Sequence, residues 1–151
     1  ADVVERIGRL QAQVRALEKD VQEARRRAAR DLVGEMLAKA RDVKGVRVVE
    51  AQVEPMDPAG LRELADAIKG RLASGLVLLG TVEEGRCHLV AGVTQDLAST
   101  YSATDIVRNA ARFVGGGGGG RRDMAQAGGS KIEGFASALS SLSAWLAERR
   151  P

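Results

Sequence analysis

The stretch best suited to chemistry runs from Phe113 to Ser130, because it combines a glycine tract with two arginines. Six consecutive glycines, Gly115–Gly120, lead directly into Arg121 and Arg122. Glycine brings no side chain that holds a ligand away, so backbone N–H groups in such a segment can bind phosphate oxygens. The arginines supply positive charge at the same place. The pattern predicts an anion-binding site.

A second glycine pair follows the short MAQA segment and leads into the expected start of the last helix. There, Ser130-Lys131-Ile132-Glu133 matches a capping box, in which Ser130 bonds a first-turn amide and Glu133 reaches back. A helix N-terminus adds partial positive charge and unpaired N–H groups, so it predicts the second half of a split anion site. Met124–Ala127 is expected to form a short strand that sets the spacing between the halves. The candidate nucleic-acid-binding residues are Gly116, Gly117, Gly118, Gly119, Gly120, Arg121, Arg122, Gln126, Gly128, Gly129, Ser130 and Lys131.

The competing interpretation of the tract is a flexible surface linker, because polyglycine is often one. Against a linker, the tract stands between an expected helix and an expected strand and is flanked by arginines. Gln126 is a candidate polar contact, although a strand residue of this kind is as often structural. We favour binding over the linker.

The sequence offers few residues for metal binding, cofactor binding or catalysis. Cys87 and His88 are the one cysteine and the one histidine, and adjacent strand residues point to opposite faces, so they cannot share a metal ion. The glycines satisfy G-x-G-x-x-G, but they follow a helix, whereas a dinucleotide site follows a strand. Arg121 and Arg122 also replace the Lys-Ser/Thr of a phosphate loop. No catalytic residue, metal or cofactor is therefore expected, and the chain is not expected to be an enzyme by itself.

Composition limits the class of protein further. The single cysteine excludes an internal disulfide and fits a reducing compartment, which predicts a cytoplasmic location. No apolar run approaches about 20 residues, so no membrane span is expected. A formal net charge of +3 permits a polyanionic partner without requiring one.

Residues 2 to about 42 are expected to form one long helix with a narrow apolar seam. The spacing alternates between four and three residues, which is typical of a coiled coil. The seam consists of Val3, Ile7, Leu10, Val14, Leu17 and Val21. Such a seam needs a second helix from the same chain or another protomer, unless the helix packs on its own globular domain. Four arginines near its end, Arg25, Arg26, Arg27 and Arg30, fit either a solvated face or a polyanion contact.

From Val46 the pattern becomes that of an α/β domain. A β-branched segment at 46–53 is followed by a helix that opens at Asp57-Pro58 and by an apolar run at 76–82. This strand–helix–strand order favours a parallel pair with a crossover helix. A second run at 87–93 joins the first through a predicted hairpin turn. Further helices are expected at 102–113 and from 130, the last burying Ile132, Phe135, Leu139, Leu142 and Leu146.

The predicted fold class is thus a mixed α/β sheet with flanking helices, preceded by a long coiled-coil-like helical subdomain. We place the subdomains at 1–44 and 45–151, with the glycine-rich segment 115–120 as a loop of the second.

The segment GGGGGGRRDMAQAGG, residues 115–129, closely resembles the glycine-rich signature near the carboxyl end of alanyl-tRNA synthetases. That signature belongs to the DHH-associated domain, which also occurs in some phosphoesterases. Residues 1–27 resemble the helical linker of the same synthetases, and VTQDL at 93–97 fits the order of their motifs. One departure is Arg122, which stands where the family commonly has proline.

The resemblance implies a non-catalytic carboxyl-terminal module, called C-Ala in this family. In that family the module is thought to grip the elbow of tRNA(Ala), where the D- and T-loops meet, and to help couple aminoacylation with editing. The implied partners are tRNA(Ala) or another nucleic acid in its place, and the aminoacylation and editing domains of a parent alanine-tRNA ligase. Two alternatives remain: a dimerisation module that forms a homodimer through helix 2–30, and the substrate-binding domain of a DHH phosphoesterase.

Overall fold

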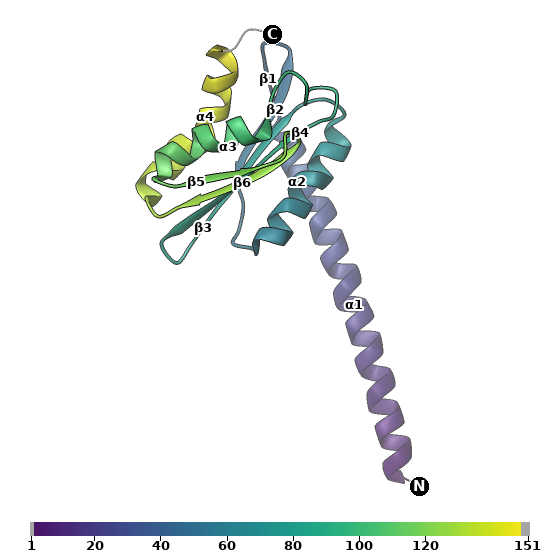
Figure 1. Cartoon of the computed structure of the whole chain (residues 1–151). Helices are drawn as coiled ribbons and strands as arrows, with labels where there is room; N and C mark the ends of the chain where they lie inside the picture. Colours follow the sequence, from purple (N-terminus) through teal and green to yellow (C-terminus); the bar gives the residue numbers. More distant parts are fainter. Residues whose placement is uncertain (1, 149–151) are drawn as a thin grey trace. The chain divides into compact units, whose positions relative to one another are not determined.

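The computed structural model describes residues 2–148 and divides the chain into two compact units between Gly34 and Glu35 (Figure 1). The first unit lies within the long helix α1, Asp2–Ala38. The prediction that this helix reaches residue 42 is wrong, because Arg41–Val43 forms the strand β1. A tight turn at Lys44 and Gly45, both at positive φ, folds β1 back onto the next strand and forces the helix to end earlier.

The apolar seam of α1 is exposed along its whole length. The seam side chains are 48–67% accessible, and Val4 beside them is 74% accessible. Within the described residues of the first unit, no other element covers them, and exposed apolar surface of this kind is typical of an interaction site. The seam residues are Val3, Ile7, Leu10, Val14, Leu17 and Val21.

The second unit is built on a six-stranded mixed sheet with the order β1-β2-β3-β4-β6-β5. Helices on its two faces complete the unit, with α2 on one face and α3 and α4 on the other (Figure 1). The elements are β2 Val46–Gln52, α2 Pro58–Leu72, β3 Leu76–Glu83, β4 Arg86–Val93, α3 Ala103–Ala111, η1 Arg112–Val114, β5 Gly117–Gly120, β6 Met124–Gly129, η2 Ile132–Gly134 and α4 Phe135–Glu148.

The first half of the sheet follows the expected strand–helix–strand order. Asp57 caps α2 by accepting a hydrogen bond from the Gly60 N–H at 2.8 Å, and Pro58 occupies the first turn. The strands β2 and β3 then pair in parallel, as predicted. The next connection is a two-residue hairpin at Glu84 and Gly85, both at positive φ, which pairs β3 with β4 antiparallel.

Helices α3 and α4 cover one face of the sheet and enclose the larger core. This core joins alternate residues of β3, β4 and β6, such as Leu78, Leu89 and Ala125, to the apolar faces of the two helices. Trp145 belongs to it, with its ring centroid 5.9 Å from that of Tyr101, so it packs in the core. Helix α2 covers the opposite face, mainly over β3 and β4. The strands β6 and β5 extend beyond it.

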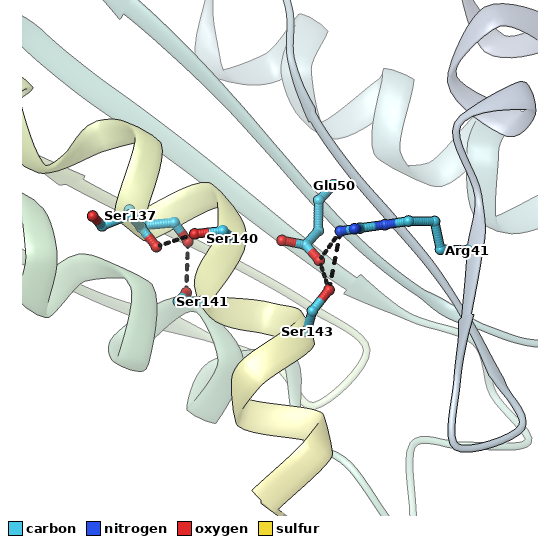
Figure 2. A network of polar contacts seen from close by, with 7 residues as sticks. Arg41, Glu50, Ser137, Ser140, Ser141 and Ser143 are labelled. Atoms are coloured by element: carbon cyan, nitrogen blue, oxygen red, sulfur yellow. Dashed lines mark hydrogen bonds and ion pairs between the residues drawn. The ribbon is translucent and has the colours of Figure 1, made fainter.

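Helix α4 is tied to the β1–β2 hairpin by a small polar network (Figure 2). The Glu50 carboxylate, 5% exposed, accepts a hydrogen bond from Arg41 at 3.2 Å and another from the Ser143 hydroxyl on α4. Lys44 donates to the carbonyl of Ala147 near the helix end. A buried carboxylate needs such partners, because leaving it unpaired costs several kcal/mol (on the order of 3–5).

The prediction that the last helix starts at Ser130 with a capping box is wrong. The 3-10 turn η2 precedes α4, and its N-cap position is Lys131, with no side-chain hydrogen bond. Backbone contact explains the tighter turn, because a side chain on Gly134 would lie 1.8 Å from the Phe113 carbonyl oxygen. Ile132, expected in the core, is consequently 46% exposed.

Candidate nucleic-acid interface

The glycine tract contains an edge strand of the sheet. The prediction that residues 115–120 form a loop is therefore corrected. Gly115, at φ +67°, ends the helical turn η1. Gly117–Gly120 then forms β5, which pairs antiparallel with β6 in the register Gly117↔Gly128 to Gly120↔Ala125. Glycine has no side-chain pattern from which a strand can be recognised, so the pairing could not be read from the tract itself.

The glycines of the tract alternate between two roles. A side-chain carbon on Gly116 would lie 1.6 Å from the Gly128 carbonyl oxygen, and one on Gly118 would lie 2.1 Å from that of Gln126. Gly120 is similarly crowded. The close approach of β5 and β6 therefore requires glycine at these three positions, independently of any ligand.

The intervening glycines have no such structural requirement. A side-chain carbon on Gly117 would meet nothing within 4 Å, and one on Gly119 would meet only the Arg108 guanidinium at 3.6 Å. Both have ordinary backbone angles, since neither is among the residues at positive φ. Bare backbone at these two positions leaves a surface that a flat ligand can approach closely.

The two arginines after the tract have different environments. The Arg121 side chain is 80% exposed, and its ion pair is with Asp123 at 3.5 Å. Arg122 donates from Nε to the Ala98 carbonyl at 2.8 Å and from an Nη to the Ser99 carbonyl at 3.4 Å. Arg122 thus holds the hairpin loop against the turn before α3, while Arg121 projects into solvent.

The backbone of this hairpin loop is held at three further points. The Ala103 N–H donates to the Arg122 carbonyl at 2.8 Å, and the Val93 N–H donates to the Asp123 carbonyl at 3.0 Å. The Lys69 ammonium of α2 reaches the same Asp123 carbonyl at 3.0 Å. The loop is consequently well ordered, and it presents Arg121 from a fixed backbone.

A groove runs between this loop, the open face of β5–β6 and the first turns of α2. Its positive charge comes from Arg121 and from Arg62 of α2, and no carboxylate of the described residues lines it. Sequence reasoning missed Arg62, because only the packing of α2 beside β6 brings it there. The groove is lined by Arg62, Gly119, Gly120, Arg121, Met124, Ala125 and Gln126. A neighbouring groove shares the two arginines but balances them with Glu63, Asp66 and Asp123.

The remaining sequence candidates lie outside this groove. Gly128 is on the same strand as Gln126, with half-buried His88 as its cross-strand neighbour. Gly129 packs on the Val114 carbonyl, where an added carbon would lie 2.3 Å from the oxygen. Ser130 is exposed, and the aliphatic stem of Lys131 lies against Gly115. Since α4 begins only at Phe135, the α-helix start predicted at Ser130 for the second half of the anion site is wrong, and anion binding by these residues stays a prediction.

Two groups elsewhere have shifted pKa values. Burial, and to a lesser extent the charge of Glu133, raises the pKa of the Cys87 thiol, which lies in the core. Hydrogen bonds from the Ser74 and Thr94 hydroxyls lower the pKa of Asp96. Neither belongs to a reactive cluster. Within residues 2–148, no group of three or more His, Cys, Asp or Glu side chains is placed to hold a metal ion.

Comparison with known proteins identifies the family of the globular unit. Residues 45–148 match the family model described as the DHHA1 domain. The chain belongs to the DHHA1 family. No helix among the described residues of this DHHA1 protein has the length and apolarity needed to cross a membrane.

The similarity extends to alanine-tRNA ligases and to a solved C-Ala domain. The chain is 42% identical over 149 residues to the alanine-tRNA ligase of Idiomarina loihiensis, covering 99% of this chain and 17% of that protein. It therefore spans about a sixth of the length of the curated relatives it matches. The crystal structure of the C-Ala domain from Aquifex aeolicus alanyl-tRNA synthetase superposes with a TM-score of 0.68 at 28% identity, covering 72% of this chain and 98% of that one. The predicted family and the mixed α/β fold class are confirmed.

A more distant likeness concerns the fold alone. A DHH domain from a member of a family of ribosomal proteins matches with a TM-score of 0.56 at 14% identity, covering 88% of this chain and 33% of that one. The DHHA1 architecture is thus compatible with more than one parent protein.

Proposed function

We propose that this DHHA1 protein is a non-catalytic, tRNA-binding module of an alanine-tRNA ligase. The proposal rests on the similarity to alanine-tRNA ligases and to the C-Ala domain together with one structural observation. That observation is the groove in which exposed Arg121 and Arg62 flank bare strand backbone at Gly119 and Gly120. The parent activity, a cytoplasmic location and the help in coupling aminoacylation with editing are parts of the same proposal.

The groove is better suited to recognising the shape of the tRNA(Ala) elbow than to reading a base sequence. It offers guanidinium donors and a side-chain-free surface, but Gln126 is its one amide side chain among the described residues. Folded RNA is recognised mainly through shape, phosphates and ribose, whereas reading bases takes several polar side chains or aromatic platforms. No aromatic residue of the described chain lines the groove. Binding is therefore expected to depend on the three-dimensional shape of the tRNA.

Replacement of single arginines tests the groove. Each phosphate contact that is lost lowers the slope of log K against log salt by roughly 0.7–0.9. We expect this decrease for Arg121→Ala and for Arg62→Ala, measured with tRNA(Ala) transcript over a range of salt concentrations. Arg47→Ala is the matched control, because Arg47 is an exposed arginine of β2 with three strands between β2 and β5. Equal slopes for the parent chain and all of these variants would refute the groove as the binding surface.

A DHH phosphoesterase domain is the weaker alternative, since the likeness to a DHH domain extends to the fold only. It predicts preference for short single-stranded oligonucleotides over folded tRNA. Competition between tRNA(Ala) and an oligonucleotide of a few residues separates the two, because elbow recognition requires the folded RNA.

A second function, homodimerisation, is favoured by the exposed seam of α1. Its spacing places Ile7, Val14 and Val21 at one core position and Leu10 and Leu17 at the other. β-branched residues at the first position with leucine at the second favour a parallel two-stranded coiled coil. Sedimentation of the chain without residues 2–30, compared with the full chain, tests this. An oligomeric state that is the same in both proteins would exclude dimerisation through the seam.

A further inference from the structure

The outer edge of β5 exposes backbone groups that the sheet does not use. The hairpin closes where the Arg121 N–H donates to the first carbonyl of β6 at 2.8 Å. Hydrogen-bonded and non-bonded residues alternate in an antiparallel ladder. Counting back from Arg121, Gly119 and Gly117 turn their backbone groups toward β6. Gly118 and Gly120 therefore turn theirs outward, toward the open edge of the sheet.

Side chains of α3 occupy the outward carbonyls but not the outward N–H groups. The Arg108 Nε donates to the Gly118 carbonyl at 3.3 Å, and the Thr104 hydroxyl is shared between the Gly120 carbonyl at 3.1 Å and the Arg121 carbonyl at 3.2 Å. These contacts confirm the outward direction derived from the ladder. The ladder register leaves the N–H groups of the same two glycines without a partner in β6, and no backbone acceptor outside the ladder binds them within the described chain. The edge thus presents donors alone.

This asymmetry distinguishes between two possible occupants of the edge. A strand from another protein must donate to edge carbonyls as well as accept from edge N–H groups. Both carbonyls already have donors, so an added strand would have to displace Arg108 and Thr104. An anion needs only donors, and the remaining guanidinium N–H groups of Arg108 add charge beside them. Asp105 precedes Arg108 by one turn but forms no ion pair with it in the described residues.

We propose that the outer edge of β5 is a phosphate-binding site formed by the N–H groups of Gly118 and Gly120 and the guanidinium of Arg108. Two residues of a strand span about 6.6 Å, so the two N–H groups can serve one phosphate each along a ribose–phosphate chain. The site shares Gly120 with the groove beside α2, but its charge comes from Arg108 of α3 and not from Arg62 or Arg121. It deepens the proposed function, on which the assignment of the phosphate to RNA rests.

Amide NMR of the full chain tests the site with inorganic phosphate as the probe. Sodium phosphate, titrated at constant ionic strength against chloride, should move the Gly118 and Gly120 amide signals in a saturable way. The Gly117 and Gly119 amides face β6 and should move much less. The amide of Gly85, in the distant hairpin turn at positive φ, serves as a control for general effects of the salt.

Variants of α3 test whether Arg108 supplies the positive charge of the phosphate site. Arg108→Ala should weaken phosphate binding about tenfold, because a hydrogen bond to a charged group is lost. Arg108→Lys should retain part of the affinity. Thr104→Val is the matched control, since it removes a donor to a carbonyl without touching the N–H groups. A well-dispersed spectrum with no saturable shift at Gly118 and Gly120, or binding unchanged in Arg108→Ala, would overturn the proposal.

A parallel titration with tRNA(Ala) distinguishes the source of the phosphate. Movement of the same two amides identifies the site with the RNA backbone, and movement with inorganic phosphate alone identifies it with a free phosphate ligand. The outcome is independent of the groove test, because Arg62→Ala and Arg121→Ala can reduce the salt slope of tRNA binding whether or not the β5 edge binds phosphate. The two proposals can therefore fail separately.

Discussion

The alternation of glycines in β5 predicts that neighbouring positions of one tract respond in opposite ways to the same substitution. Gly118→Ala places a carbon 2.1 Å from the Gln126 carbonyl oxygen and 2.5 Å from Ala127 Cα. Ordinary van der Waals contacts of such a carbon are 3.4–4 Å long. The atoms met first are backbone, so β5 must move away from β6. Gly117→Ala places its carbon in open space.

The expected magnitudes follow from packing and hydrogen bonding. Forcing extra carbon into a filled space costs roughly 1–3 kcal/mol. Separating the strands also weakens the ladder bonds beside Gly118, at about 0.5–1.5 kcal/mol each. We therefore expect Gly118→Ala to lose about 2–5 kcal/mol of the free energy of unfolding. Gly117→Ala should gain about 0.4–1 kcal/mol, because alanine reduces the entropy of the unfolded chain at a compatible position.

Urea denaturation of both variants and the parent chain measures this difference. Tryptophan fluorescence is a suitable signal, because Trp145 is buried in the core of the globular unit. Equal midpoints for Gly117→Ala and Gly118→Ala would refute the alternation and with it the edge strand. The same pair is informative for binding. Gly117→Ala keeps the fold, so any loss of tRNA affinity in this variant reflects the surface and not stability.

Two further predictions concern residues around the hairpin and its neighbouring turn. Arg122→Ala should lower the melting temperature and the tRNA affinity, because the Arg122 guanidinium donates to the carbonyls of Ala98 and Ser99. The salt slope of tRNA binding should stay at the parent value. A slope reduced as in Arg121→Ala would show direct phosphate contact. Asp96→Asn should destabilise the protein at neutral pH. The folded pKa of Asp96 is depressed, so its contribution is present above the ordinary carboxylate pKa and disappears as pH falls through the lower folded value. Melting curves of both proteins should therefore converge in acid, and a difference that persists there would contradict the assignment.

The sequence was informative wherever side-chain pattern determines structure. The cap at Asp57, the turn at Glu84 and Gly85 and the apolar runs around them specify the parallel pair and the hairpin, and the structure contains both. These features are local, or they repeat with the period of one element. Their prediction required no knowledge of tertiary contacts.

The candidate site was harder to predict, because it depends on backbone proximity and on distant elements. Polyglycine carries no periodicity, so β5 was mistaken for a loop. The capping-box pattern at Ser130 was overridden by the close contact of Gly134 with the Phe113 carbonyl.

The positions of the arginine side chains around the site likewise depend on tertiary contacts that the sequence does not show. Adjacent arginines look equivalent in sequence, yet only the turn at Ala98 shows that Arg122 has structural partners. Arg62 and Arg108 come from helices whose positions beside β5 and β6 follow from the sheet order. Neither could be assigned to the site before the packing of those helices was known.

The edge position of β5 also affects how the folded state opens. An edge strand has one neighbour, and β5 has no side chains to bury, so its attachment depends on ladder bonds to β6 and on contacts with α3. Local opening of such a segment costs less free energy than global unfolding. Amide hydrogen exchange in β5 should then be fast compared with that in β3 and β4, although all three belong to one sheet. Binding of a ligand to this edge would have to offset the free energy of closing the locally opened strand. The affinity for the ligand would therefore depend on the stability of the four-residue strand β5.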